Sequence, residues 1–402
     1  MKMKKNLFMV AAVALVAAVS CNKEGLGDNT QTPSSIVFTA GIDTKTVLVP
    51  DTDGDATVNH QIHWESGDEI VVDGVTFKTT DSGAKANFTT ESAFTADNDY
   101  YAIYPASAGT TLESVTVPAA QEVEAGKFNP SAVVSVAKST TTSLEFKNVT
   151  SLLKFQVPAP ATTVTISSSS PLAGEVSVNY NAGEPTWTGV NTVNTITVTG
   201  SFQTGKDYYV AVLPGAKTNF EVRIDGYYSK YAASVTLERS VVMNMKILPA
   251  PEICKYGIVG GHQGWSIVEA NLTKLYKVNR NETLYAVKDI QLKNNGFKFF
   301  KVGATSWDIA GNYDPGKDTN SYGVHTTSNG VDYYKYDTEN GGKWYEYWTN
   351  SGDIGNKKEN IGVSNFNLKY DIYLYFEDKT SEPDPYQHFK FTIVKAGDKM
   401  PS

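Results

Sequence analysis

Aromatic side chains and a few hydrogen-bonding residues in the last third of the chain have the types and spacing for chemistry. Trp265 follows a Gly-Gly-His-Gln-Gly loop, and Trp307 lies beside a second loop. Lys298 and Lys301 belong to the run Phe-Lys-Phe-Phe-Lys, and Asn360 lies further along. An indole can stack on the apolar C–H face of a sugar ring, while an amine or amide can bond to its hydroxyls. These residues therefore form a candidate carbohydrate site.

Each of these residues also has a purely structural interpretation. Trp265 can fill the end of a β-sandwich, and Trp307 can be a core residue, because large aromatic side chains are usually buried. Lys298 can be a solvated lysine of an edge strand. Strand alternation puts Phe297 and Phe299 on one face and Lys298 on the other, so the lysine is the residue of this run that we expect to reach a ligand.

The most aromatic segment is Lys-Trp-Tyr-Glu-Tyr-Trp at residues 343–348. In a strand, Trp344 and Trp348 share one face, and Tyr345 and Tyr347 share the other. We expect one face to be core and the other to be a platform, and the sequence leaves open which is which. Trp344 and Trp348 join the carbohydrate-binding candidates.

Motifs for catalysis or metal binding are weak. Asp51, Asp53 and Asp55 have the spacing of a calcium loop, but the glycine and glutamate that complete it are missing, so an acidic turn is the better interpretation. His60 and His63 would lie on opposite faces of a strand. The sequence has no serine-nucleophile elbow, zinc-protease motif or phosphate loop. We therefore expect no enzyme activity, no cofactor and no metal.

Composition excludes several classes of protein. The 402 residues are 41% hydrophobic and 19% charged, with a net charge of −8 at pH 7, which is unlike a wholly disordered chain. The acidic balance argues against nucleic-acid binding through counter-ion release. Two cysteines cannot build a disulfide framework or a Cys-based zinc site, and we expect Cys254 to be a small apolar core residue.

The N-terminal segment predicts export. Three lysines precede an apolar run at residues 7–19, which is shorter than the roughly 20 residues of a membrane-spanning helix. Residues 1–20 are typical of a signal peptide. The last three of these residues and Cys21 form the sequence Ala-Val-Ser-Cys at 18–21, which resembles a bacterial lipobox and implies that Cys21 is acylated. The alternative is an ordinary signal peptide with an unrelated cysteine. Residues 21–35 are rich in Asn, Gly, Thr, Ser and Pro, as in a flexible tether.

Short β-branched or alternating runs recur about every ten residues from Ile36 onward, a spacing typical of β-sandwiches. Capped segments with helical periodicity are lacking. Four of the six tryptophans and 14 of the 23 tyrosines lie after position 250, and Pro249-Ala-Pro251 marks this shift as a boundary. With a softer boundary at Pro158-Ala-Pro160, the sequence predicts an all-β protein with tandem β-sandwiches at 36–158, 159–250 and 255–397.

Residues 36–250 resemble the fimbrillin-like (Mfa-like) family of Bacteroidetes lipoproteins. The matching motifs, in order, are Thr44–Thr46, Trp64–Ile70, Tyr100–Pro105, Phe146–Phe155, Leu172–Glu175 and Tyr208–Pro214. The resemblance implies two transthyretin-like β-sandwiches and, in pilins of the family, polymerisation by strand exchange after cleavage at an arginine. The first arginine here is Arg223, which argues against a main pilus subunit processed in this way.

Residues 255–395 are similar to the carbohydrate-binding domains of the SusE/SusF starch-binding lipoproteins. The matching segments are Tyr256–Trp265, Phe297–Lys301 followed by Trp307, Asn360-Ile361 and Tyr370–Tyr375. The similarity is interrupted by an insertion at residues 317–358. It implies an Ig-like carbohydrate-binding β-sandwich in which Trp265, Lys298, Lys301 and Asn360 contact an α-glucan.

These observations predict a lipid-anchored, non-catalytic glycan-binding protein of the outer membrane that faces the cell exterior. Its implied partners are a polysaccharide or oligosaccharide, which the resemblance makes an α-glucan, and outer-membrane lipid through Cys21. Other surface lipoproteins or a TonB-dependent transporter are further implied partners. The alternative is a fimbrial accessory or tip adhesin that assembles with fimbrial subunits. A glycoside hydrolase would need two carboxyl groups about 5–10 Å apart in a groove.

Overall fold

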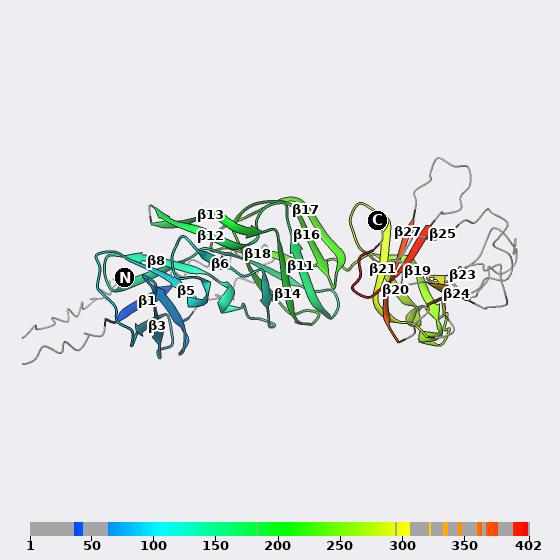
Figure 1. Cartoon of the computed structure of the whole chain (residues 1–402), viewed down its shortest axis with the longest axis horizontal. Helices are drawn as coiled ribbons and strands as arrows, with labels where there is room; N and C mark the ends of the chain where they lie inside the picture. The colour runs from blue at the N-terminus through cyan, green and yellow to red at the C-terminus, as the bar shows by residue number, and fades with distance from the viewer. Residues whose placement is uncertain are drawn as a thin grey trace, which may run out of the picture. The chain divides into compact units, whose positions relative to one another are not determined.

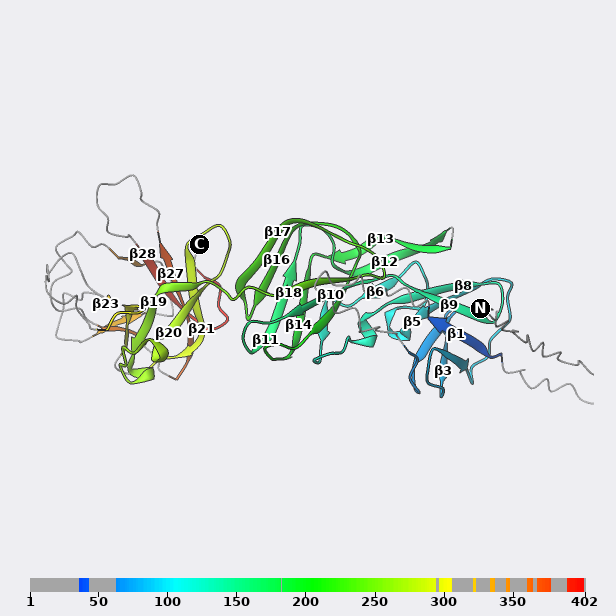
Figure 2. The same ribbon diagram turned by 180° about the vertical axis from the view of Figure 1, so that it is seen from behind.

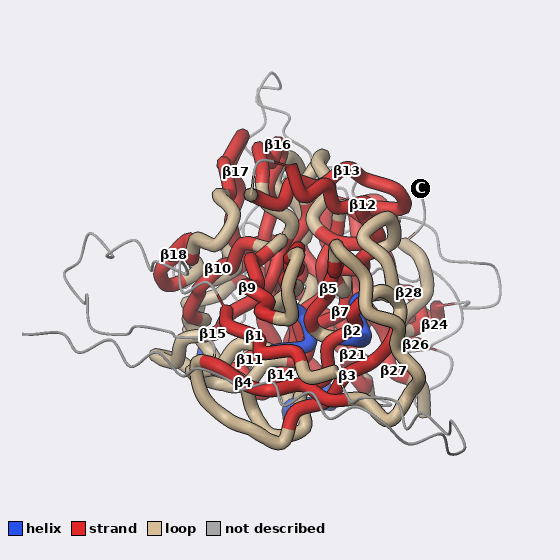
Figure 3. The backbone as a smooth tube through the Cα atoms, turned by 90° about the vertical axis from the view of Figure 1, so that its left-hand side faces the viewer, coloured by secondary structure: helices blue, strands red, loops and turns tan. Residues whose placement is uncertain are grey.

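The computed structural model describes residues 36–42, 63–181, 183–293, 296–305, 321–322, 333–336, 345–347, 360–363, 367–376 and 389–400. The predicted signal peptide, Cys21, the tether and the acidic turn lie outside these residues. Strands dominate the described residues (Figure 3), and the helical elements are the 3-10 turns η1 (Ala106–Ala108), η2 (Pro130–Ala132), η3 (Gly261–Gln263) and η4 (Glu269–Asn271). The all-β prediction is confirmed.

The first sheet closes into a barrel. Its strands follow the order β1 (Phe38–Ile42), β4 (Lys85–Thr89), β3 (Val75–Thr79), β2 (Glu69–Val72), β5 (Tyr100–Tyr104), β8 (Ser135–Ser139) and β9 (Ser143–Asn148). β1 is antiparallel to β4 and parallel to β9, and the second pairing closes the ring. A closed sheet leaves no strand edge for another chain to pair with.

Aromatic side chains fill this barrel. Trp64 is 1% exposed, and its indole N–H donates to the carbonyl of Ala40 at 2.9 Å. The rings of Phe88 and Phe146 meet the indole edge-on, with centroids 4.9 and 5.5 Å from it. Edge-to-face contact is a favoured geometry for aromatic pairs, so these rings hold the barrel core together.

Three further sheets form the second region. Its strands are β15 (Tyr208–Val212), β10 (Ser151–Gln156) and β18 (Val242–Ile247) in one sheet; β17 (Tyr227–Leu237), β16 (Gly215–Ile224), β11 (Ala161–Ser167), β14 (Thr195–Phe202) and β7 (Ala120–Glu122) in the next; and β13 (Glu184–Val193), β12 (Ala173–Asn181) and β6 (Val115–Val117) in the last. β6 and β7 precede residue 158 but pair with strands that follow it. The domain limit at 158 stays a prediction.

The sheet β15–β10–β18 lies between two hydrophobic cores. Leu152, Ala211 and Val242 are opposite one another across its strands and belong to the barrel core. The neighbouring pair Leu153 and Val210 belongs to the core of the second region. All five side chains are at most 5% exposed. Because both of its faces are apolar, this sheet packs against the two modules, the barrel and the rest of the second region. Figure 2 shows β10 and β18 side by side.

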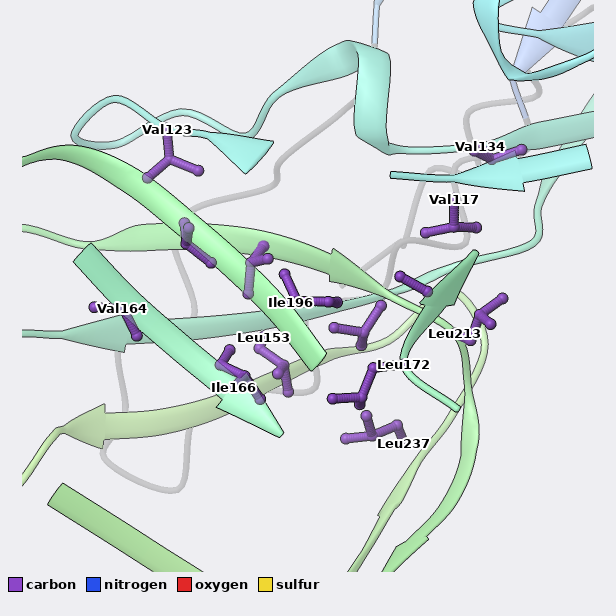
Figure 4. Close-up of a cluster of buried hydrophobic side chains, with 14 of the residues drawn as sticks. Val117, Val123, Val134, Leu153, Val164, Ile166, Leu172, Ile196, Leu213 and Leu237 are labelled. Atoms are coloured by element: carbon purple, nitrogen blue, oxygen red, sulfur yellow. The ribbon is translucent and has the colours of Figure 1, made fainter. Parts of the chain in front are cut away.

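Side chains from all three sheets of the second region meet in its core. Figure 4 shows Val117 of β6, Leu153 of β10, Ile166 of β11 and Ile196 of β14 within this cluster. Each of these four side chains is fully buried. The region is therefore one hydrophobic core enclosed by three sheets.

A third sheet system follows residue 250 and appears in yellow to red in Figure 1. Its strand order is β24 (Tyr333–Tyr336), β26 (Asn360–Val363), β22 (Phe297–Lys301), β19 (Ile253–Gly260), β20 (Thr273–Lys277), β21 (Leu284–Gln291), β27 (Lys369–Phe376), β28 (Phe389–Lys395) and β25 (Tyr345–Tyr347), with β23 (Ser321–Tyr322) on β22. Cys254 is 1% exposed in its core, and burial raises the pKa of the thiol to about 12. The prediction that Cys254 is a core residue is confirmed.

The hairpin formed by β16 and β17 contacts the sheet of the third region, which follows residue 250. The Tyr227 ring lies 5.1 Å from that of Tyr276, and the Tyr227 hydroxyl oxygen accepts the Lys288 backbone N–H at 3.1 Å. The guanidinium of Arg223 donates to the carbonyl of Val278. Packed rings and hydrogen bonds thus join the second and third regions.

Lys217 is a buried lysine in the second region. It is 1% exposed, and its ammonium donates to the carbonyls of Pro171 and Pro214 at 2.7 and 3.0 Å. The ammonium also lies 5.7 Å from the centroid of the Trp187 ring. Within the described residues Lys217 has no carboxylate partner. Burial lowers the pKa of this lysine to about 8.

We expect substitutions on either face of the sheet β15–β10–β18 to lower the temperature of one and the same unfolding transition. We expect Leu152→Ala and Leu153→Ala each to lower the free energy of unfolding by about 2–5 kcal/mol, because each opens a cavity in a packed core. Differential scanning calorimetry of the whole chain would follow the unfolding transition of residues 36–250. Two separate transitions, with each substitution shifting only one of them, would contradict the coupling.

The pKa of Lys217 predicts a rise in stability with pH. The folded state releases this proton near pH 8, whereas the unfolded lysine keeps it to about pH 10.5. Between these values the unfolded state binds more protons, so the free energy of unfolding increases by up to about 1.4 kcal/mol per pH unit. Urea titrations at pH 8.0 and 9.5 give the free energy of unfolding at each pH. Its slope against pH should be more positive for the native chain than for Lys217→Met. Equal slopes would refute this assignment, and comparing slopes cancels the opposing contribution of Cys254.

Candidate functional site

The predicted carbohydrate-site residues centre on the pair of strands β19 and β22. The two strands are antiparallel, with Val259 opposite Lys298 and Gly260 opposite Phe297. A Cβ at Gly260 would lie only 2.5 Å from the carbonyl oxygen of Gly296, so the backbones approach too closely there for any side chain. β19 ends at this glycine, and the loop that carries Trp265 begins.

Trp265 has an unusual backbone conformation. Its φ is +60°, directly after Gly264 at +77°, and its N–H donates to the carbonyl of Gly260 at 2.9 Å. The half-buried indole packs against a small cluster that includes Leu272 and Phe300. A bulky residue in the left-handed region is strained, so the surrounding loop must hold it. Trp265 is thus partly packed and partly exposed.

Side-chain bonds hold the loop that carries Trp265. Gln263 accepts the backbone N–H of Ser266 at 2.7 Å and donates to its carbonyl at 2.8 Å. His262 Nε2 lies 2.8 Å from Thr273 Oγ1, and its buried Nδ1 has no partner within the described residues. Burial, with a smaller contribution from Lys293, lowers the pKa of His262. A neutral imidazole is therefore favoured beside Trp265.

β22 separates the two candidate lysines. Phe297 and Phe299 are fully buried in the core of the third region, which confirms that they share a face. Lys298 lies half-buried on the other face, the face of Phe300 and therefore of the cluster that packs Trp265. Lys301 is exposed at the end of the strand, where alternation puts it on the opposite face from Lys298.

The remaining candidates are only partly located. Trp307, Trp344 and Trp348 lie outside the described residues. Asn360 begins β26, and the antiparallel pair Phe297–Ile361 puts position 360 opposite position 298. The structure thus brings Trp265 and Lys298 to one face, with position 360 beside them in register. Carbohydrate binding by these residues stays a prediction.

A cleft lies among residues that the sequence analysis did not propose as a binding site. This cleft has a volume of about 370 Å³ and lies between β5 and β8 of the barrel and β12. Its lining includes Asp73, Tyr101, Glu113, Lys138 and Asn179. These residues are far apart in the chain, and no local motif connects them. The exposed aromatic in Tyr100-Tyr-Ala-Ile-Tyr104, where alternation sends every second side chain outward, was the one available signal.

The described residues contain neither a metal cluster nor a transmembrane helix. Nowhere in them do three or more His, Cys, Asp or Glu side chains gather in a way that could hold a metal ion. In the same residues, no helix is both long enough and apolar enough to span a membrane.

Comparison with known proteins gives weak likenesses of fold. No family model matches the chain, and no curated protein matches it. A "putative cell adhesion protein" from Bacteroides uniformis is 18% identical, with 54% of this chain and 93% of that one covered and a TM-score of 0.32. A protein of the same description from Bacteroides ovatus is 16% identical, with 54% and 93% covered and a TM-score of 0.33. A fimbrial protein from Bacteroides ovatus is 10% identical, with 61% and 54% covered and a TM-score of 0.25. Likenesses this weak carry no argument about function.

Proposed function

We propose that this chain is a non-catalytic adhesion protein of the bacterial cell surface, an accessory or tip subunit of a fimbria-like assembly. In this proposal Cys21 carries the lipid that holds it to the outer membrane, and the regions between residues 36 and 250 connect that anchor to the C-terminal region. The resemblance of residues 36–250 to fimbrillin-like lipoproteins and the lipobox at Cys21 support it.

The observation that carries the proposal is the sheet β15–β10–β18. An adhesion protein transmits tension from a surface-bound ligand to its anchor, and a hinge or an exposed linker would give way first. Here β10 is bonded to β15 and β18 on its two sides, and the apolar faces of the sheet are buried in two cores. Pulling the barrel away would expose the apolar face that Leu152, Ala211 and Val242 bury, and pulling β10 out of the sheet would also break its backbone bonds, so this junction is suited to bearing tension.

Adherence of whole cells tests this function. We expect deletion of the chain from the source bacterium to reduce attachment to immobilised mucin, extracellular matrix or partner cells at least severalfold. Complementation with the native chain should restore attachment, whereas complementation with Cys21→Ala should not, because the protein would lose its anchor. Protease treatment of intact cells followed by immunoblotting would show whether the native chain faces outward.

Two outcomes contradict the proposal. One is a deletion strain that adheres to all three surfaces as well as its parent does. The other is full protease protection of the native chain on intact cells when a known surface protein is digested. Cys21→Ser is a second, more conservative variant. It also lacks the thiol that lipidation needs, so it should fail to restore attachment just as Cys21→Ala does.

A second candidate function is glycan binding by the C-terminal region. It is favoured by one observation: Trp265 and Lys298 lie on the same face of the β19–β22 pair. A partly exposed indole next to an amine suits a sugar ring with an apolar face and polar rim. The resemblance to starch-binding lipoproteins makes an α-glucan the first ligand to test.

Affinity electrophoresis of the whole chain through gels that contain soluble starch, other plant glucans or mucin tests this candidate. We expect at least one polymer to retard the chain, and we expect Trp265→Ala and Lys298→Met to abolish most of that retardation. Lys395→Met is the matched control, because it removes an exposed lysine of β28, which is not a strand of the β19–β22 pair, and should not matter. Unchanged migration in every gel, or equal effects of both lysine substitutions, would argue against this site.

A further inference from the structure

The cleft between the barrel and β12 has the form of a small ligand site. Its volume of about 370 Å³ falls at the lower end of the range for small-molecule sites. Three of its lining side chains, Ile103, Leu112 and Val178, are less than 10% exposed. They supply an apolar floor, and the more exposed lining residues surround it.

Tyr101 and Lys138 form one wall of this cleft. They are directly opposite each other in the pairing of β5 with β8, and the ammonium lies 5.1 Å from the centroid of the Tyr101 ring. A cation at this distance from a ring is attracted to it, so the contact restrains both side chains. Tyr101 is 37% exposed, which leaves part of a large aromatic surface available next to the apolar floor.

The rim is polar and has an excess of acceptors. Asp73, Glu113 and Asn179 are all exposed at the cleft. Two carboxylates against the one ammonium of Lys138 give the lining a net negative charge, which disfavours an anionic ligand. Carboxylates accept hydrogen bonds, whereas the amide both donates and accepts them. A ligand rich in hydroxyl groups matches this combination.

The walls of the cleft are fixed by bonds within the chain. Asp73 donates its N–H to the carbonyl of Tyr101, and its carboxylate accepts the Tyr101 N–H, both at 3.0 Å. Val178 donates to the carbonyl of Leu112 at 2.7 Å. At Gly109, a Cβ would lie 2.2 Å from the carbonyl oxygen of Ser114, so the loop can turn there only with glycine. A preformed cleft loses little conformational entropy when a ligand binds.

The two barrel strands that line the cleft, β5 and β8, are not available for strand addition. β5 pairs with β2 and β8 inside a closed barrel, and β8 pairs with β5 and β9. A peptide that binds by adding a strand needs an unpaired edge, which these strands do not offer. Recognition on the barrel side of the cleft must therefore come from side chains.

We propose that this cleft binds one ring of a neutral saccharide. The C–H face of the sugar lies on the Tyr101 ring and the apolar floor. Its hydroxyls donate to the carboxylates of Asp73 and Glu113 and bond to the amide of Asn179. This site is separate from the Trp265 face, and it requires neither the adhesion function nor glycan binding by the C-terminal region.

Saturation-transfer NMR with the full chain in detergent tests the proposal, because it detects weak binding of small ligands to a large protein. The probes are methyl α-glucoside, methyl β-galactoside, methyl α-mannoside and N-acetylglucosamine, with sialic acid as the anionic comparison. We expect transfer to at least one neutral sugar and none to sialic acid. Tyr101→Ala and Asn179→Ala should each weaken binding about tenfold, the equivalent of about 1.4 kcal/mol.

Matched variants separate this cleft from other parts of the chain. Tyr228→Ala removes a half-exposed tyrosine of β17 outside the cleft, and it should leave the affinity unchanged. Repeating the measurements in the Trp265→Ala background removes any contribution of the C-terminal glycan site, and Tyr101→Ala and Asn179→Ala should have the same effect there. Circular dichroism would confirm that each variant is folded. The proposal is overturned by no transfer to any neutral sugar, by stronger transfer to sialic acid, or by binding that survives both cleft substitutions.

Discussion

The sheet β15–β10–β18 is the element on which the arrangement of the first two regions depends. A strand normally buries one face, yet here successive residues of β10 are committed to different cores: Leu152 packs into the barrel and Leu153 into the second region. Shifting the register of this strand by one residue would exchange the two sets of side chains. The register is therefore specified from both sides, and each core is complete only when the other has formed.

This arrangement also explains where the proposed saccharide cleft lies. Ile103 of β5 belongs to the core of the second region, although β5 is a barrel strand. The same outward face of β5 carries Tyr101 two residues earlier, at the point where the packing ends and solvent begins. The cleft thus lies at the border of the contact between the two modules, and neither module alone would supply all of its walls.

Local rules predicted much of the fold but little of the cleft. Alternation in Phe297–Phe299 predicted which side chains enter the core, and the continuous apolar run of residues 208–212 became β15, whose five residues are all buried. These patterns involve neighbours in the chain. By contrast, the parallel pairing of β1 with β9 joins residues about one hundred positions apart, and no short pattern encodes such a contact.

The same limit applies to the candidate sites. Trp265 was found from residue type and loop context, but its left-handed backbone follows from a bond to Gly260 and from packing against Phe300. Asp73 and Tyr101 meet through backbone bonds in the barrel, whereas Asn179 comes from β12 of another sheet, so no stretch of sequence contains all three. Sequence reasoning located side chains of a suitable type, whereas the geometry that makes a site depends on contacts across sheets.

The connection at Pro158-Ala-Pro160 has a consequence for proteolysis. Ala159 and Pro160 are exposed, so a protease can reach the chain between β10 and β11. A cut there would not release a fragment, because β10, upstream of the cut, stays bonded to β15 and β18 downstream of it. β6 and β7 likewise stay paired with β12 and β14. A nicked molecule would remain in one piece, held by its sheets in place of the severed peptide bond.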